Sequence, residues 1–157
     1  MADGVFNIAK GKVAAYHDRV NDGDPSTSRL VVVGLASTGL VADSVMKDSA
    51  TLAAVLAGAS DECTNTNYAR KTLTSADIAA ITVDNTNDWV TADLADQVWS
   101  SVANDGTGAW GKLLVCYDGV TGSGTDSDVV PLTYHDFVVT PNGGNITAAI
   151  ANYFKAA

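Results

Sequence analysis

The sequence predicts a mainly β protein, a single-domain β-sandwich or barrel of about seven or eight strands with one short helix. Three observations support this prediction. Residues 110–118 form the densest apolar run in the C-terminal half and end in an Asp-Gly turn signal. Residues 29–35 form a second apolar run that is rich in β-branched residues. Gly, Thr, Asn, Asp and Ser are abundant, whereas charged residues make up only 17% of the chain, a composition typical of short strands joined by turns.

The stretch from 110 to 118 is the predicted centre of the fold. Leu113, Val115 and Tyr117 point to one face of an extended strand, and Leu114 and Cys116 point to the other. A strand that is apolar on both faces belongs in the middle of a core, with other elements covering each side. The stretch is short for a buried helix and is bounded by glycines, which favours a strand.

The N-terminal residues 5–20 allow two interpretations. Their side chains alternate in a way that fits a strand, but Val13, Tyr16 and Val20 also fit a helical stripe. Gly11 disfavours the helix, so we expect a strand here. The polar residues 21–28 form a loop that leads into the predicted strand 29–35.

The rest of the chain predicts one helix and several more strands. Residues 49–58 contain good helix formers, with an Asp or Ser N-cap at position 48 or 49 and a glycine stop at 58. Strands are expected at 68–73, 97–102 and 129–139, and Pro131 places the start of the last of these at an edge or a bulge. Residues 84–96 are expected to be irregular, and residues 146–154 to form a last strand or a short helix.

Composition excludes several classes of function. The chain has 157 residues, which fits one domain spanning 1–157. Its net charge is −9 and it has nine Lys and Arg in all. It therefore lacks the basic patch needed for nucleic acid or an anionic membrane surface. No apolar run approaches the length of a membrane span, and the start has no secretory signal. We expect synthesis in a reducing cytoplasm.

Two short patterns suggest ligands but fit poorly. The segment 34–39 resembles a phosphate-binding loop, yet the Lys that would reach the phosphates is replaced by Leu40. Asp118, Asp126 and Asp128 surround a Gly-rich loop that could cradle calcium, but the spacing is not that of an EF-hand. Acidic residues also occur in turns for geometric reasons alone. We expect no cofactor and no metal, and leave calcium at the 118–128 loop open.

Reactive side chains are few and scattered. His17 and His135 are each isolated in sequence, and neither a GxSxG nor an HExxH motif is present. Cys63 and Cys116 lack CxxC spacing, and Cys116 lies within the predicted central strand, where a thiol usually acts as a small buried hydrophobe. We therefore expect no catalytic residues and no enzymatic activity. A hydrolase that uses His17 or His135 is the alternative.

Aromatic residues and exposed segments indicate where a partner could bind. Trp99 and Trp110 fit the core, whereas Trp89 stands in a polar stretch and is the tryptophan expected to meet a partner. Composition also places the N-terminal segment and the 118–128 loop at the surface. The predicted partner-binding residues are Val5, Phe6, Ile8, Trp89, Thr121 and Ser123.

Several stretches together resemble a family of tailed-bacteriophage structural proteins found in phages of actinobacteria. The resemblance covers most of the chain and includes no catalytic motif. The resembling stretches are residues 9–13, 16, 19–20, 48, 51–54, 66–73, 96–99, 111–118, 130–133 and 135–137.

This resemblance implies a minor structural or head-associated virion protein with no enzymatic role. Among virion components, it favours a capsid decoration protein that binds the outer surface of the head shell and reinforces it. The expected partners are the major capsid protein and further copies of this chain, with a trimer favoured. The expected location is the capsid surface of the virion. The alternative is a tail-associated or host-binding module that recognises carbohydrate.

Overall fold

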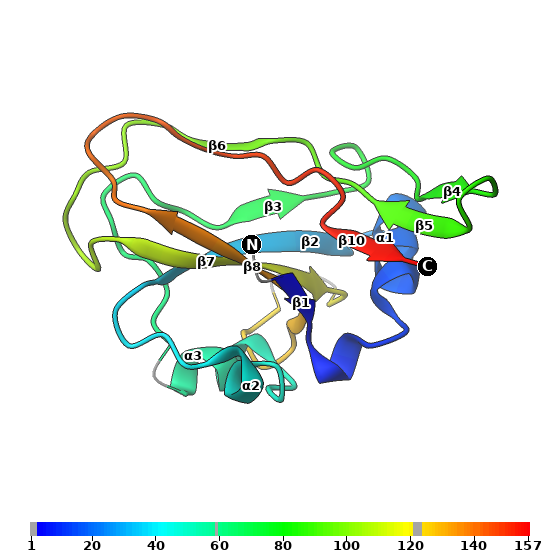
Figure 1. Ribbon diagram of the computed structural model, residues 1–157, viewed down its shortest axis with the longest axis horizontal. Coiled ribbons are helices and arrows are strands. Elements are labelled where there is room, and N and C mark those ends of the chain that lie inside the picture. Colours follow the sequence, from blue (N-terminus) through cyan, green and yellow to red (C-terminus); the bar gives the residue numbers. More distant parts are fainter. Residues whose placement is uncertain (1–2, 59, 121–123) are drawn as a thin grey trace.

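The computed structural model describes residues 3–58, 60–120 and 124–157 and is mainly β, as predicted (Figure 1). Its largest sheet has five antiparallel strands in the order β1-β8-β7-β2-β3. The bounds of these strands are Asp3–Val5 (β1), Arg29–Ala36 (β2), Lys71–Leu73 (β3), Trp110–Asp118 (β7) and Val130–Val139 (β8).

Strand β7 lies in the middle of this sheet and all nine of its residues are buried. It pairs with β2 from Arg29 opposite Asp118 to Ala36 opposite Trp110. The predictions for 110–118 and 29–35 are therefore confirmed. The chain's two densest apolar runs pair with each other, and this pairing forms the centre of the core.

The two register shifts between β7 and β8 fall at a glycine, which has no side chain, and beside a proline, which has no backbone N–H to donate. The β7–β8 register shifts between Val115 and Cys116, and Cys116 is paired with Pro131. The prediction that Pro131 marks an edge or a bulge is thus confirmed. A second shift falls at Gly111, where an added Cβ would lie only 2.9 Å from Ser37 Cα.

A second layer of strands covers one face of the large sheet, which gives a sandwich-like arrangement (Figure 1). It contains a three-stranded sheet, β10-β5-β4, and the pair β6-β9. Their bounds are Thr82–Asp84 (β4), Trp89–Ala92 (β5), Gln97–Trp99 (β6), Ile146–Ala148 (β9) and Phe154–Ala156 (β10). The opposite face of the large sheet is covered by the helices α2 (Asp43–Met46) and α3 (Leu52–Ala57).

The N-terminal prediction of a strand at 5–20 is wrong for most of its length. Residues Val13–Asn21 form helix α1, preceded by a short 3-10 helix, η1 (Asn7–Ala9). Val13, His17 and Val20 are buried on one face of α1, so the helical stripe prevails over the alternating pattern. Gly11 lies before the helix at a φ of +73°, where glycine is favoured and costs the helix nothing.

Two further predictions are corrected in detail. The predicted helix at 49–58 exists as α3, but its N-cap is Thr51, whose Oγ1 accepts from the Ala54 N–H at 3.2 Å. With α1 and α2, the described chain has three α-helices instead of one.

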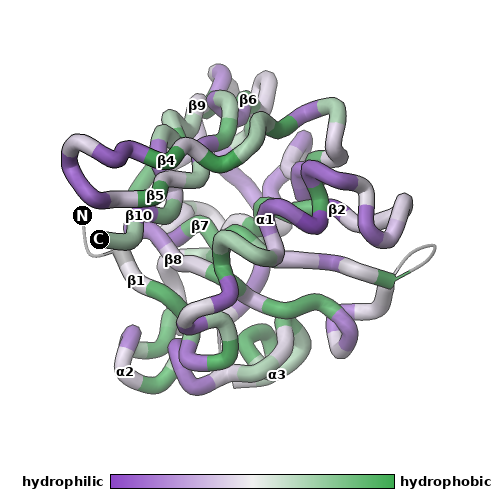
Figure 2. The backbone as a smooth tube through the Cα atoms, turned by 90° about the vertical axis from the view of Figure 1, so that its right-hand side faces the viewer, coloured by the Kyte–Doolittle hydropathy of each residue, from purple (hydrophilic) through white to green (hydrophobic). Residues whose placement is uncertain are grey.

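Residues 84–96 are not wholly irregular, because Asp84 accepts from the Thr86 and Asn87 N–H groups and closes a hairpin between β4 and β5. The turn of this hairpin is hydrophilic and protrudes near the C-terminus (Figure 2).

The tryptophans predicted for the core are confirmed there. Trp99 and Trp110 are buried and meet edge to face, with ring centroids 5.1 Å apart. The Trp110 Nε1–H donates to Asn65 Oδ1 at 2.8 Å, and Asn65 Nδ2 donates to three carbonyl oxygens of the 103–108 loop. The buried amide thus fixes the loop that leads into β7.

None of the helices in the described ranges is long and apolar enough to cross a membrane.

Candidate functional site

The predicted partner-binding residues lie in different environments. The prediction for Phe6 is wrong, because this residue is not at the surface. Phe6 is fully buried and packs edge to face on Tyr134, with ring centroids 5.4 Å apart. Its N–H donates to the Leu132 carbonyl at 3.0 Å. Because β1 pairs with β8, the chain carries the Phe6 ring into the core, where it cannot meet a partner.

The neighbouring apolar residues lie nearer the surface. Val5 is half-buried in β1, whereas Ile8, on η1, is 39% exposed. The Asn7 N–H donates to the Lys47 carbonyl at 2.8 Å, which fastens η1 to the end of α2. On α2, Val45 is 62% exposed. We call Ile8 and Val45 the η1–α2 surface. No local pattern points to Val45, because nothing in the neighbouring residues shows that its helix is only one turn long.

Trp89 lies at the start of β5 and is half-buried. The Lys155 ammonium sits over its indole, 3.1 Å from the ring centroid, a cation–π contact. Val83 of β4, Val90 of β5 and Ala156 of β10 are paired across the three strands and line an open hollow of about 300 Å³. Trp89 thus borders a surface hollow, and Lys155 covers one face of its ring.

Thr121 and Ser123 lie outside the described residues. The carboxylates around that loop have separate partners. Asp118 accepts from Arg29 Nε at 2.9 Å and from the Val120 N–H at 3.0 Å, and Asp128 accepts from the Thr125 N–H at 3.0 Å. In the described part of the chain, no group of three or more His, Cys, Asp or Glu side chains is placed to hold a metal ion.

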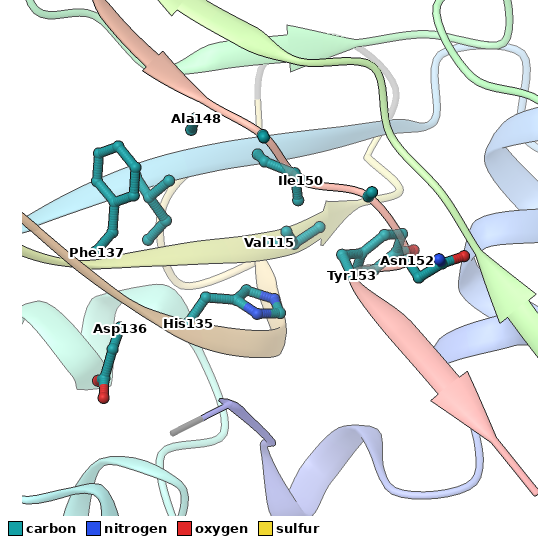
Figure 3. Close-up of a pocket in the computed structure, with 11 residues that line it drawn as sticks. Val115, His135, Asp136, Phe137, Ala148, Ile150, Asn152 and Tyr153 are labelled. Atoms are coloured by element: carbon teal, nitrogen blue, oxygen red, sulfur yellow. The ribbon is translucent and has the colours of Figure 1, made fainter. Parts of the chain in front are cut away.

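A cavity of about 280 Å³ lies between the large sheet and the C-terminal segment (Figure 3). Its walls are mostly apolar, and His135 of β8 is its main titratable group. His135 Nε2 lies 2.9 Å from Thr133 Oγ1. Asp136 points in a different direction from His135 (Figure 3), since neighbouring residues of a strand face opposite sides. The two side chains therefore leave β8 in different directions. The residues that line the cavity are Leu113, Val115, His135, Asp136, Phe137 and Ala148–Tyr153.

His17 is a buried structural residue. Its Nε2 lies 2.7 Å from the Ala79 carbonyl oxygen, which can only accept, so this nitrogen carries the proton. Nδ1 then accepts from the Tyr153 hydroxyl at 3.0 Å. Burial raises the pKa of Tyr153, which keeps that hydroxyl a donor. His17 thus joins α1 to two later segments of the chain.

The two thiols are buried, unpaired and held in the protonated form. Burial, followed by the charge of Glu62, raises the pKa of Cys63 to about 12. Burial also raises the pKa of Cys116, which confirms its predicted position in the core. A thiolate is the nucleophilic form of cysteine, so neither side chain is poised for catalysis at neutral pH.

Two cations each lie between two carboxylates. Arg70 Nε and Nη2 donate to the two oxygens of Glu62 at 2.8 and 2.6 Å, and Nη1 and Nη2 donate to Asp126 at 2.5 and 3.0 Å. The guanidinium lowers the pKa of Asp126. Lys112 Nζ contacts Asp136 and lies 3.0 Å from Asp43 Oδ1. We call these groups the Arg70 triad and the Lys112 triad. No local sequence pattern predicts either triad, because most of the charged partners are far apart in the chain.

Comparison with known proteins gives no family, relative or fold neighbour. No family model matches the chain, and neither a curated protein nor a solved structure matches it.

Proposed function

We propose that this protein is a non-enzymatic bacteriophage virion protein that decorates the capsid by binding the outer surface of the head shell. Its partners in this proposal are the major capsid protein and further copies of itself, with a trimer favoured. The sequence resemblance supports the virion assignment. The acidic, strand-rich chain supports a role in binding, since its charge suits a soluble surface protein.

The observation that carries the proposal is the position of large apolar side chains on small peripheral elements. Val45 and Ile8 are exposed on the η1–α2 surface, and Val83 is exposed on the β4–β5 hairpin. The reactive side chains, in contrast, are buried or engaged: His17 and both thiols lie in the core. Large apolar side chains that are exposed on the surface are candidates for contact with a partner. Many weak contacts of this kind, repeated over a shell, stabilise the state that they bind.

Quantification of the protein in purified particles tests this proposal. We expect a copy number that matches repeating units of the shell, and retention on heads that lack tails. Absence from particles would overturn the proposal.

A pair of variants tests the surface. Val45→Asp places a charge on the η1–α2 surface and is expected to abolish incorporation into particles. Val138→Asp is the matched control, because Val138 of β8 is 84% exposed and lies on another element. Both variants should fold normally. If both variants were incorporated into particles as well as the wild type, the η1–α2 surface would not bind the shell.

The second candidate function is a tail-associated or host-binding module that recognises carbohydrate. The hollow beside Trp89 favours it, since sugars bind to open surfaces that contain an aromatic ring. A few copies per particle, together with quenching of Trp89 fluorescence by host glycans and its loss in Trp89→Phe, would favour this function over capsid decoration.

A further inference from the structure

The Lys112 triad brings an amine and two carboxyl groups together on one side of the large sheet. Lys112 of β7 and Asp136 of β8 are direct cross-strand partners, and such positions have Cβ atoms about 4.5–5.5 Å apart. Asp43, the first residue of α2, lies on the other side of the amine, with its Oδ1 3.0 Å from Nζ. The Lys112 side chain is only 6% exposed.

The amine is covered on one side by an aromatic ring. Its Nζ lies 5.6 Å from the centroid of the Tyr134 ring, which in turn packs on the buried Phe6. The two carboxylate side chains are more open, with Asp43 34% and Asp136 37% exposed. Burial of the ammonium offsets part of its attraction to the carboxylates. The Arg70 triad shows the alternative, in which a guanidinium binds both carboxylates through a planar fork. An amine differs from a guanidinium because it becomes a nucleophile once it loses a proton.

We propose that Lys112 and Asp136 form an intramolecular isopeptide bond, with Asp43 as the group that transfers protons. The reaction joins Lys112 Nζ to Asp136 Cγ and releases one water molecule. It needs no oxidant, reductant or external co-reactant.

Asp43 takes one proton from the Lys112 ammonium and passes it to an Asp136 oxygen, so that the neutral amine attacks Cγ of a neutral carboxylic acid. In the resulting tetrahedral intermediate, the hydroxyl oxygen of Asp136 receives a second proton from the nitrogen, and the C–O bond breaks to release water. The product is a secondary amide, and Asp43 returns to its carboxylate form. Fixing the two groups side by side replaces a bimolecular encounter, an effect equivalent to about 10⁵–10⁸ M in well-oriented systems.

The charges of the triad set the conditions for the reaction. Burial alone would lower the pKa of Lys112, but the bonds with Asp136 and Asp43 outweigh it and raise that pKa. The ammonium is therefore the resting form, and it must pass a proton to Asp43 before the amine can attack. Because that proton stays within the triad, we expect the bond to form slowly at neutral pH.

Intact-mass spectrometry of the full-length protein under denaturing conditions tests the proposal. The expected mass is lower than that of the linear chain by one water molecule. After trypsin digestion, cleavage at Lys112 should be lost and a branched peptide should join Lys112 to the segment that contains Asp136. Because a succinimide at an Asp-Gly step loses the same mass, the sample is also incubated at mildly alkaline pH, which rehydrates a succinimide and leaves an amide intact.

Variants assign the roles. Lys112→Arg keeps the positive charge and should have the full linear mass, as should Asp136→Ala. Asp43→Asn keeps the shape of the side chain but removes the proton acceptor, and should leave the chain unlinked although folded. Lys47→Arg is the control and should remain linked. A folded wild-type protein that keeps the full linear mass after long incubation at neutral and raised pH would overturn the proposal and identify the triad as an ion pair only. The wild-type result does not depend on whether any variant folds.

Discussion

Arg70 and Lys112 each neutralise two carboxylates, but they join different parts of the fold. The Arg70 triad connects the segment before β3 to Asp126, a residue whose carbonyl also accepts from the Ala53 N–H of α3. The Lys112 triad connects α2 to the β7–β8 pair. The side chain of Arg70 is 30% exposed, whereas that of Lys112 is 6% exposed. The carboxylates are comparably exposed in the two triads, at 22% and 35% beside Arg70 and at 34% and 37% beside Lys112. The triads therefore differ mainly in the cation: the guanidinium holds both carboxylates through a planar fork, whereas the amine is placed for the bond proposed above.

The largest expected effect follows removal of the buried amine. Lys112→Met should lower the free energy of unfolding by about 3 kcal/mol, because a covalent link that closes a loop of this size restricts the unfolded chain by about that amount. Urea denaturation of the variant and the wild type measures the loss. A loss smaller than that of Arg70→Ala would indicate that Lys112 contributes only ionic contacts.

Removal of the more exposed cation should have a smaller effect. Arg70→Ala leaves Glu62 and Asp126 facing each other without a counter-charge, and we expect a loss of about 2 kcal/mol, below the value for a fully buried pair. Arg70→Lys is the control and should recover only part of this loss, since an ammonium cannot bind both carboxylates through a planar fork. Full recovery would argue that charge alone matters at this site.

The Arg70 triad should make the stability of the protein depend on pH in the acid range. The guanidinium holds the pKa of Asp126 below its ordinary value. A group with a lowered folded-state pKa stabilises the protein above its unfolded pKa of about 3.9, and this contribution disappears as the pH falls through the folded-state value. Urea midpoints measured between pH 6 and pH 2 should therefore fall at the acid end, and Asp126→Asn should flatten that fall. An unchanged slope in the variant would contradict the assignment.

The thiols report local opening around the Arg70 triad. Cys63 and Cys116 should not react with a thiol reagent in the native protein at neutral pH, and both should react in denaturant, because burial keeps them protonated and covered. Since Cys63 follows Glu62 in the chain, Arg70→Ala should accelerate its labelling more than Lys112→Met does at equal stability. Rapid labelling of the folded wild type would contradict the buried positions.

Local patterns predicted the centre of the fold well. The apolar runs at 110–118 and 29–35 specify buried strands because every side chain in them needs cover. The helix α1 was missed because its segment fits both periods, and Gly11 counts against a helix only if it lies inside one. The strand β5 was missed because the Asp84 turn cluster masks a short hairpin.

The candidate sites depend on contacts that no local pattern contains. Arg70 and Asp126 are 56 positions apart, and Lys112 meets Asp136 only once the β7–β8 register is set. Phe6 is predicted to lie at the surface because it belongs to a terminal segment. Only the pairing of β1 with β8 shows that its ring is buried. Val45 was overlooked for the converse reason, since its exposure follows from how α2 rests on the sheet.

Co-sedimentation with phage heads determines whether this protein binds a head shell, as we propose. Purified protein is mixed with heads from a phage that lacks its gene, in the expanded and the unexpanded form. We expect saturable binding to expanded heads, in proportion to the repeating units of the shell, and weak binding to unexpanded heads. Failure to bind either form would contradict it.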